Sequence, residues 1–404
     1  MAEELTRFTY MPLVGKRILL GLTGSSAVYR SIDLARRLIR MGAVVKVVMS
    51  KASTRFIGVD LVHWATGYKP YVEMSGETEH IDLASWADAM LIAPATLNAL
   101  SKIVAGVADE LIYLTAVTLM GGGKMIIAVP TMNIRLYKSP QYVKAEREFM
   151  EMGGLIIPPF IEEDKVKFPP IDDLSHCVDA MINRSRELAG KRVLVTAGPT
   201  VEHIDPVRVI TNPSSGLMGV MMAREFACRG AIVDLVHGPL GVQPPYMVTR
   251  HPVETTAEMA SKVEELTGAI EYDAAVFAAA PADYTPTEKH PAKISTRERP
   301  ELTLRLVKTV KVVSRIGKRP RVLVGFAAET EGGDALVRRA VEKASEYGFD
   351  LVVANNVASK GAGFGSEYLD VAIVESGKTV VSGVVNKALV ARYVADYVEK
   401  KLRD

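Results

Sequence analysis

Short apolar runs alternate with helix-type segments along the whole chain. The runs cover residues 89–95, 125–130, 274–280, 321–329 and 350–356, and most of them contain small residues or proline near their ends. Continuous apolar runs of this length are typical of parallel strands that are buried on both faces. Segments with helix-type spacing of apolar residues separate them, most clearly over residues 257–266, 335–347 and 387–402. The pattern therefore predicts the alternating strands and helices of an α/β fold.

The same sequence pattern opens both halves of the chain. Gly15 starts the segment GKRILLGLTGSS, and Gly190 starts the segment GKRVLVTAGPT. In each half a helical segment, a Gly-Ala pair and another apolar run follow. This repeat predicts two strand-loop-helix-strand units, each of which opens a domain that binds its ligand beyond the carboxyl ends of the strands. We therefore predict an α/β protein with two Rossmann-like parallel-sheet domains, residues 1–188 and 189–404.

The composition narrows the class of protein. A chain of 404 residues is long enough for two hydrophobic cores. The net charge is +2, from 49 basic and 47 acidic residues, so no overall field favours nucleic acid or an anionic membrane surface. The uncharged apolar run of residues 111–123 is too short to span about 30 Å of hydrocarbon. Because residues 1–17 also lack the basic start and apolar core of a signal peptide, we expect a cytoplasmic protein with no nucleic-acid partner and no membrane association.

The loop after the first apolar run is a candidate anion site. Gly24, Ser25 and Ser26 stand there, directly before a helical segment. Backbone N–H groups at a helix start attract phosphate, although a tight turn capped by serine explains the same residues equally well. The glycine spacing of a dinucleotide-binding loop is incomplete, and no acidic residue follows the second apolar run. Both features count against a pyridine-nucleotide reductase, the generic alternative for a doubled α/β chain.

Three further motifs of the first half occur in order: His80, Pro94-Ala95-Thr96-Leu97-Asn98 and Pro130-Thr131-Met132-Asn133. Taken alone, His80 is more typical of a helix cap or a buried hydrogen-bonding residue, and Asn133 is as typical of a turn. Together the motifs resemble those of the homo-oligomeric flavin-containing cysteine decarboxylases, over Val14 to about Leu188. The resemblance implies that His80 acts as a base and that Asn133 holds the substrate carboxylate. The implied FMN site is lined by Gly24, Ser25, Ser26, Ser50, Thr96 and Asn98.

The implied reaction explains why a flavin is needed. Loss of CO₂ from a cysteine carboxylate would leave an unstabilised carbanion, a barrier that side chains alone hardly lower. If FMN first oxidises the carbon that bears the thiol, the resulting thioaldehyde accepts the electrons as CO₂ leaves. Reduced FMN then returns the hydride equivalent to the enethiol.

One loop of the first half departs from this resemblance. Bifunctional bacterial relatives carry Cys-Gly on a flexible loop near the end of the domain, whereas this chain has IEEDKVKFPPIDD and no cysteine there. Lys165 or Lys167 of this loop either covers the substrate or belongs to a solvated run of charges. The missing cysteine motivates an alternative function, a monofunctional ligase whose first domain binds flavin without decarboxylation or serves as a scaffold.

The second half contains its own candidate anion site. Gly198-Pro199 ends an apolar run, and Asn212-Pro213-Ser214-Ser215-Gly216 precedes a helical segment. Hydroxyl and N–H groups at such a position either bind a phosphate or cap the turn, and the residues alone favour neither interpretation.

Five sequence blocks of the second half resemble those of phosphopantothenate-cysteine ligases, over Lys191 to about Lys400. In chain order they are AGPTVEHIDPVRVITNPSSGLMG, AAAPADYTP, KIST, GFAAET and DLVVANNV. With both halves in this order, the chain resembles the bifunctional enzymes of coenzyme A biosynthesis. The resemblance implies that CTP, or ATP in some branches, activates the carboxylate of 4'-phosphopantothenate as an acyl-nucleotide, which L-cysteine then attacks. Mg²⁺ or Mn²⁺ would clamp the phosphates, and the first half would decarboxylate the product to 4'-phosphopantetheine.

The resemblance also implies roles for residues of the second half. Asn212 handles the acyl intermediate and Lys293 faces the phosphates, and both are implied catalytic residues. The implied nucleotide-binding residues are Ala279, Ala280, Asp283, Lys293, Phe326 and Lys343. No metal ligand is implied. The implied assemblies are trimers of the flavin domain and dimers of the ligase domain, which combine into a dodecamer.

Two positions of the second half depart from the ligase pattern. Tyr347 stands where a second phosphate-binding lysine is expected, and Leu369 and Asp370 stand near the place of an expected asparagine. These departures leave the choice between CTP and ATP open. A non-catalytic regulatory subunit of the same fold is a further alternative, and the intact His80 and Asn133 argue against it.

Overall fold

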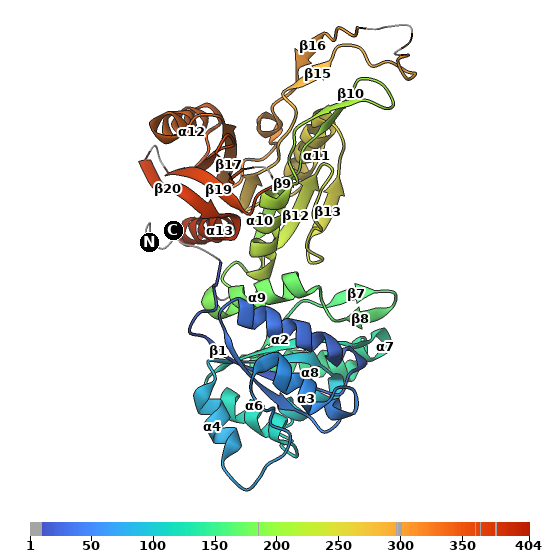
Figure 1. Cartoon of the computed structure of the whole chain (residues 1–404), viewed down its shortest axis with the longest axis vertical. Coiled ribbons are helices and arrows are strands. Elements are labelled where there is room, and N and C mark those ends of the chain that lie inside the picture. Colours follow the sequence, from blue (N-terminus) through green and yellow to red (C-terminus); the bar gives the residue numbers. More distant parts are fainter. Residues whose placement is uncertain are drawn as a thin grey trace. The chain divides into compact units, whose positions relative to one another are not determined.

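The computed structural model consists of two compact units (Figure 1). It describes residues 10–184, 186–295, 297, 301–359, 361–363, 365–375 and 378–404, so residues 1–9 of the N-terminal arm and Thr296 of the KIST block lie outside the described residues. One unit is Met11–Ser185, and the other runs from Arg186 to Asp404 and includes Tyr10. Each unit has its own large sheet and its own hydrophobic core.

The first unit is built on a five-stranded parallel sheet. In spatial order its strands are β2 (Val44–Met49), β1 (Arg17–Leu22), β3 (Ala89–Ala95), β4 (Met125–Pro130) and β6 (Leu155–Ile156). The chain passes from β1 to β2 on one side and then crosses to β3 on the other side. The topological switch point therefore lies between β1 and β3, and ligands of open parallel sheets bind at such points, beyond the carboxyl ends of the strands.

Helices cover both faces of this sheet (Figure 1). They are η1 (Ser26–Tyr29), α2 (Arg30–Arg40), η2 (Ser53–Arg55), α3 (Val59–Thr66), α4 (Glu79–Trp86), α5 (Leu97–Val104), α6 (Leu111–Gly121), α7 (Ile134–Tyr137), α8 (Pro140–Glu151) and α9 (Ile171–Arg184). The helix α2 packs against α3 and α9, whereas α6 packs against α4 and α5. Every residue of β3 is buried, which explains the unbroken apolar run in its sequence.

A small antiparallel sheet follows β4 in the chain. The strand β5 (Met132–Asn133) pairs with β8 (Lys165–Lys167), and β8 pairs with β7 (Phe160–Glu162). In this register Asn133 lies opposite Lys165. The pairing therefore fixes the lysine-containing hairpin β7–β8 beside the motif residue Asn133.

The second unit is built on an eight-stranded sheet. In spatial order its strands are β13 (Thr249–Pro252), β12 (Ile232–His237), β9 (Arg192–Ala197), β14 (Ala274–Phe277), β17 (Val322–Glu329), β18 (Leu351–Asn356), β19 (Tyr368–Glu375) and β20 (Lys378–Asn386). The strands from β13 to β18 are parallel and have the order of a dinucleotide-binding fold, with the switch point between β9 and β14. The predicted parallel α/β fold is thus confirmed, but β19 and β20 extend the sheet in the antiparallel sense. An antiparallel edge tolerates one solvated face, and β20 is mostly exposed or half-buried.

Helices also cover both faces of the second sheet (Figure 1). They are α10 (Leu217–Cys228), α11 (Thr256–Ala269), η3 (Val312–Arg315), α12 (Gly333–Tyr347) and α13 (Lys387–Arg403). Neighbouring residues of β9 point to opposite faces, because Val193 and Val195 belong to the core under α10 and α13 whereas Leu194 belongs to the core under α11. Burial on both faces again explains a strand without polar alternation.

Two short hairpins of the second unit lie outside its large sheet. The strand β10 (Val201–His203) pairs with β11 (Val209–Thr211), and β15 (Tyr284–Pro286) pairs with β16 (Leu306–Lys308). The sequence did not predict the strands β10 and β11, because strands of three residues are too short to show periodicity.

The other predicted elements are confirmed apart from their ends. The apolar runs form β3, β4, β14, β17 and β18, and the three helical segments form α11, α12 and α13. The strand formed by the run 274–280 ends at Phe277. Beyond it, the N–H of Ala279 donates to the hydroxyl of Thr196 and the N–H of Ala280 donates to the carbonyl of Gly198, both at the end of β9, so these groups do not continue the regular hydrogen bonding of the sheet. No helix in the described part of the chain combines the length and the apolar character needed to cross a membrane.

Candidate active sites

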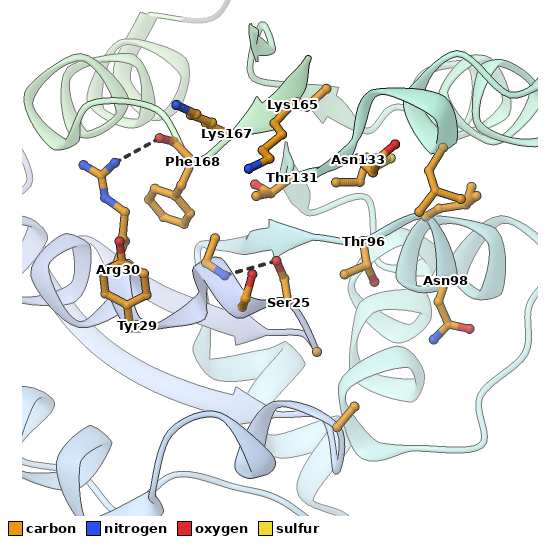
Figure 2. A pocket seen from close by; sticks show the side chains of 18 of the residues that line it. Ser25, Tyr29, Arg30, Thr96, Asn98, Thr131, Asn133, Lys165, Lys167 and Phe168 are labelled. Atoms are coloured by element: carbon orange, nitrogen blue, oxygen red, sulfur yellow. Dashed lines mark hydrogen bonds between the residues drawn. The ribbon is translucent and has the colours of Figure 1, made fainter. Parts of the chain in front are cut away.

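A cavity of about 740 Å³ lies at the switch point of the first sheet (Figure 2). Its volume is in the range of small-molecule and cofactor sites, about 300 to 1,000 Å³. Figure 2 shows Ser25 and Thr96 on one side of the cavity and Lys165, Lys167 and Phe168 on the other. The predicted site residues that line it are Gly24, Ser25, Ser26, Thr96, Asn98 and Asn133.

Thr23 joins the loops that follow β1 and β3. Its hydroxyl donates to the carbonyl of Pro94 (2.7 Å) and accepts the N–H of Thr96 (3.3 Å). Thr96 is itself the N-cap of α5, where its hydroxyl accepts the N–H of Ala99 (3.2 Å). These bonds hold the two predicted FMN-binding loops side by side at the edge of the sheet.

Gly24 permits a close approach of two chain segments beside the cavity. A Cβ at this position would lie 2.5 Å from the Cβ of Ala52, closer than two carbon atoms can come. Ser25 caps the helical turn that leads into α2, because its hydroxyl accepts the N–H of Ala27 (3.3 Å). A capped helix start without a side chain at Gly24 therefore borders the cavity.

Asn98 and Tyr113 form a polar pair in the cavity wall. The Nδ2 group of Asn98 donates to the Tyr113 hydroxyl (3.4 Å). Burial raises the pKa of Tyr113 to about 12, and the charge of Glu110 adds to this shift while the bond from Asn98 opposes it. Tyr113 is therefore a neutral hydroxyl at physiological pH that can donate its O–H to a ligand.

Asn133 caps α7 and keeps a donor for a ligand. Its Oδ1 accepts the N–H of Arg135 (2.9 Å), so its Nδ2 group is left to face other partners. An amide N–H₂ group is a donor of the kind that binds a carboxylate. The geometry is therefore compatible with the predicted role of Asn133, which stays a prediction.

The two lysines of β8 have different surroundings. The ammonium of Lys167 bonds the carboxylates of Glu162 and Glu163, at 2.8 Å each, and these bonds raise the pKa of Lys167. Lys165 has no ion pair with any described residue, and Figure 2 shows its side chain extending toward Thr131. Lys165 is thus the β8 lysine that is available to an anionic ligand.

Two predicted residues of the first unit do not line this cavity. Ser50 is buried, and its hydroxyl accepts the N–H of Ser53 (3.2 Å), so it stabilises the turn after β2. His80 is half-buried in the first turn of α4, which Figure 1 shows well away from the hairpin β7–β8. A single chain therefore does not bring His80 and Asn133 to one cavity.

Sequence reasoning missed Arg30, Tyr113 and Phe168. The Arg30 guanidinium donates to the carbonyl of Phe168 (3.2 Å) and lies 5.8 Å from the centre of its ring (Figure 2). The position of Arg30 at the start of α2, close behind the serine cap, was an available signal for an anion-binding residue. Tyr113 and Phe168 come from distant segments and carried no local signal.

The residues of this cavity fit a flavin mononucleotide. The helix start at Ser25 and the guanidinium of Arg30 suit a phosphate, and Gly24 leaves room for it. The hydroxyl of Thr96 and the amide of Asn98 suit polar atoms of a ring system.

A second cavity, of about 380 Å³, lies at the switch point of the second sheet. Residues from the loop before α10, the loop after β14, the strand β17 and the helix α12 line it. The predicted nucleotide and substrate residues among them are Asn212, Ala279, Ala280, Asp283, Phe326 and Lys343.

Asn212 is held by the loop that follows β14. Its Nδ2 group donates to the carbonyls of Ala280 and Pro281, at 3.0 Å each. The same loop is tied to β9, because the N–H of Ala279 donates to the hydroxyl of Thr196 (3.2 Å). The Asn212 side chain is therefore fixed in the cavity wall, with Oδ1 left as an acceptor.

Gly216 allows the start of α10 to pass close to the end of β9. Its φ is +76°, and a Cβ there would lie 2.3 Å from Cδ2 of Leu240 and 3.2 Å from the backbone of Gly198. A side chain at Gly216 would thus require both strain and displacement. The hydroxyl of Ser214 accepts the N–H of Gly216 (3.3 Å), and the hydroxyl of Ser215 accepts the N–H of Leu217 (3.4 Å).

Two predicted ligands of the nucleotide already have partners within the chain. The carboxylate of Asp283 pairs with Lys311 (2.5 Å), and the ammonium of Lys343 pairs with Glu329 (2.8 Å). A ligand that used either side chain would have to share it with this partner or replace the partner.

Lys293 is exposed and does not line the second cavity. The next residue, Ile294, is anchored, because its N–H donates to Oδ2 of Asp205 (3.1 Å). Burial alone would raise the pKa of Asp205, but the N–H groups of Val207, Ile294 and Arg208 and the Arg208 guanidinium lower it far below its usual range. A buried carboxylate thus fixes the loop at Ile294 and leaves the Lys293 side chain outside the wall.

Sequence reasoning missed Lys387, Asn355 and Lys311 in this wall. Lys387 looked like the first residue of an amphipathic helix, and only the fold brings it to the cavity. Within the described residues, no three His, Cys, Asp or Glu side chains gather as a ligand set for a metal ion. The described residues of this wall therefore include no closed set of metal ligands.

Two family models match the chain. The model described as "Flavoprotein" matches residues 9–183. The model described as "DNA/pantothenate metabolism flavoprotein C-terminal domain" matches residues 188–402.

Curated relatives match nearly the whole chain. The coenzyme A biosynthesis bifunctional protein CoaBC of Thermococcus kodakarensis is 37% identical over 397 residues, which cover 96% of each chain. The protein of the same name from Methanocaldococcus jannaschii is 35% identical over 366 residues, which cover 90% of this chain and 88% of its own. Among solved structures, the C-terminal domain of a coenzyme A biosynthesis bifunctional protein CoaBC is 33% identical; the match covers 55% of this chain and 100% of that one, with a TM-score of 0.45.

Proposed function

Because the chain belongs to the family of coenzyme A biosynthesis bifunctional proteins CoaBC, we propose that its second domain joins 4'-phosphopantothenate to L-cysteine and its first domain decarboxylates the product to 4'-phosphopantetheine. The chain is a bifunctional enzyme of coenzyme A biosynthesis, with a flavoprotein decarboxylase part and a ligase part. One observation carries the assignment of the steps: each sheet has a cavity at its own switch point, lined by the motif residues of that step. A monofunctional ligase is not favoured, because the relatives match through both parts.

In the first cavity the chain binds and orients the acyl-cysteine. The Nδ2 group of Asn133 donates to the substrate carboxylate, and the hairpin β7–β8 covers the substrate and limits the access of water. The loop at Gly24 and the cap at Thr96 hold FMN. FMN, when bound, supplies the electron sink without which CO₂ loss would leave an unstabilised carbanion.

In the second cavity the chain aligns a nucleoside triphosphate with 4'-phosphopantothenate. The substrate carboxylate attacks the α-phosphorus, pyrophosphate leaves, and the amine of L-cysteine then displaces the nucleotide from the acyl group. Asn212 is the proposed residue that binds the acyl intermediate. Two hydrogen bonds from its Nδ2 group fix the side chain, so its Oδ1 acceptor is held in one orientation. Lys293 reaches the phosphates from its exposed loop when the ligands are bound.

CTP is the proposed nucleotide, with ATP as the alternative, and Mg²⁺ or Mn²⁺ is the proposed metal ion. Mg²⁺ is commonly held by substrate phosphates and water with few protein ligands, which agrees with a wall that has no closed set of acidic ligands among the described residues. No step is assigned to a metal ligand of the chain.

The proposed enzyme is a cytoplasmic homo-oligomer, with trimers of flavin domains, dimers of ligase domains and a dodecamer as the complete assembly. The position of His80 supports an oligomer. His80 lies outside the cavity that holds Asn133 of the same chain, so a neighbouring copy is the proposed source of the base.

A single assay of the full chain tests both steps. With 4'-phosphopantothenate, L-cysteine, CTP and Mg²⁺, purified protein is expected to release pyrophosphate and CO₂ in equal amounts. ATP in place of CTP settles the nucleotide preference. The His80→Asn variant is expected to release pyrophosphate at the wild-type rate. Its rate of CO₂ release is expected to fall about a hundredfold or more, because a general base has been removed.

The separate readouts decide between the functions. If wild-type protein saturated with FMN releases pyrophosphate but no CO₂, the protein is a monofunctional ligase. Absence of both products would contradict the proposed function.

A further inference from the structure

Lys387 is a buried cation in the wall of the second cavity. It is the first residue of α13, it is 4% exposed, and it lines the cavity together with Asn212 and Phe326. Neither the motifs nor the comparisons point to this residue.

The Lys387 ammonium has a carbonyl partner and no acidic one. Its Nζ donates to the carbonyl of Gly363 (3.0 Å), which is its single hydrogen bond within the described residues. No described carboxylate lies within ion-pair distance, and burial lowers the pKa of Lys387 without any opposing acidic group. Two of the three ammonium hydrogens are therefore left for other acceptors.

The other two lysines of the wall differ in this respect. Lys311 pairs with Asp283 (2.5 Å), and Lys343 pairs with Glu329 (2.8 Å). Lys387 is thus the lysine of the described wall whose charge has no compensating carboxylate. It is also the most buried of the three.

Such a charge is unfavourable in the ligand-free protein. A buried ammonium loses its hydration, and one carbonyl does not replace the attraction of a full negative charge. A bound anion would supply that charge inside a low-dielectric wall, where the attraction is stronger than in water.

The partner of Lys387, Gly363, belongs to a loop that also lines the cavity. Gly363 has a φ of +110°, a conformation that residues with a side chain rarely adopt, and its carbonyl accepts the hydrogen bond of the Lys387 ammonium. Gly363 and Gly365 both line the cavity. Lys387 and these two glycines therefore line the same cavity.

We propose that the Lys387 ammonium binds a phosphate group of a ligase substrate. This inference rests on the proposed function of the second cavity. The phosphate belongs either to the nucleoside triphosphate or to 4'-phosphopantothenate, since both carry the same acceptor oxygens, and separate titrations distinguish them.

The first test measures binding of each substrate to the full chain by calorimetry. We expect Lys387→Met to weaken the binding of one substrate, CTP or 4'-phosphopantothenate, by about tenfold to a hundredfold, as for loss of a charged hydrogen bond. Lys387→Arg, which keeps the charge, is expected to lose less. Lys400→Met is the matched control, because Lys400 lies on the same helix and is exposed.

The second test separates ligand binding from a structural role. Removal of an uncompensated buried charge is expected to leave the melting temperature of the ligand-free Lys387→Met protein unchanged or higher. If the bond to Gly363 is all that Lys387 provides, the melting temperature falls and the affinities of the folded protein do not change.

The pH dependence of binding gives a third readout. The affinity of the wild-type protein for the affected substrate is expected to fall as the pH rises through the lowered pKa of Lys387, below 10.5. Lys387→Arg is expected to show no such fall, because a guanidinium stays charged.

The outcomes are distinct. Unchanged affinity of Lys387→Met for both substrates, in protein that melts like the wild type, would overturn the inference. Failure of the wild-type protein to bind either substrate would instead contradict the proposed function itself.

Discussion

Gly24 and Gly216 exclude side chains from the two loops that are expected to bind phosphates. In both places a Cβ would meet a neighbouring atom at 2.5 Å or less, so the restriction comes from packing of specific segments. Gly24 has an ordinary negative-φ backbone, and the contact with Ala52 is therefore its main constraint. Gly216 carries the additional strain of a positive φ.

We predict that Gly24→Ala weakens FMN binding by about tenfold or more, because the methyl group must push Ala52 or the loop out of place. Flavin absorbance of the purified protein and fluorescence titration with FMN measure the effect. Gly121→Ala is the control, because its Cβ would meet nothing within 4 Å at the end of α6. Equal FMN affinity of both variants and the wild type would show that FMN does not bind at this loop.

At the scale of elements, a buried ionic cluster joins α10 to α13. Arg229, the residue directly after α10, is fully buried, and its guanidinium pairs with Glu225 (2.6 Å) of α10 and with Asp396 (2.7 Å) and Glu399 (3.3 Å) of α13. These helices cover one face of the second sheet and present Lys387 and the Gly216 loop to the second cavity.

Replacing Arg229 by Met is expected to lower the free energy of unfolding by about 3 to 5 kcal/mol, because the buried Glu225 carboxylate would lose its main counter-charge. Urea unfolding followed by circular dichroism measures the change. Lys400→Met should differ from the wild type by no more than about 0.5 kcal/mol, as for an exposed residue. A similarly small change for Arg229→Met would show that the cluster does not stabilise the contact of α10 with α13.

The long elements were predictable because burial on both faces leaves a sequence signal. The apolar runs of β3, β4, β17 and β18 are continuous for that reason, and the helices α11 to α13 have ordinary amphipathic spacing. The hairpins and the antiparallel edge at β19 and β20 were not predicted. Their strands are short or half-solvated, so the choice of partner depends on segments far away in the chain.

The candidate sites were predictable only where a motif lies next to a strand end. Gly24, Thr96 and Asn212 follow or precede a recognisable element, so the rule for parallel sheets is enough to bring them to one edge. Tyr113 and Lys387 belong to helices whose local sequence says nothing about a cavity. Their burial and hydrogen bonds depend on Asn98 and on the loop at Gly363, contacts that sequence periodicity does not reveal.

At the scale of the whole molecule, one chain contains two parallel-sheet units that use the same principle for different ligands. The first unit has its switch point between β1 and β3, and the second has it between β9 and β14. Each switch point has a cavity bordered by a helix start with glycine and serine. Two sequential reactions on phosphorylated substrates are the proposed use of this duplication.

The central claim is that FMN binds at the first switch point and the nucleoside triphosphate at the second. A crystal structure of the full chain with FMN and CTP tests it most directly. The account predicts the flavin phosphate at the Gly24–Ser26 loop and the triphosphate in the cavity bordered by Asn212 and Lys387. Density for either ligand at another place, with these two loops facing solvent, would contradict the account.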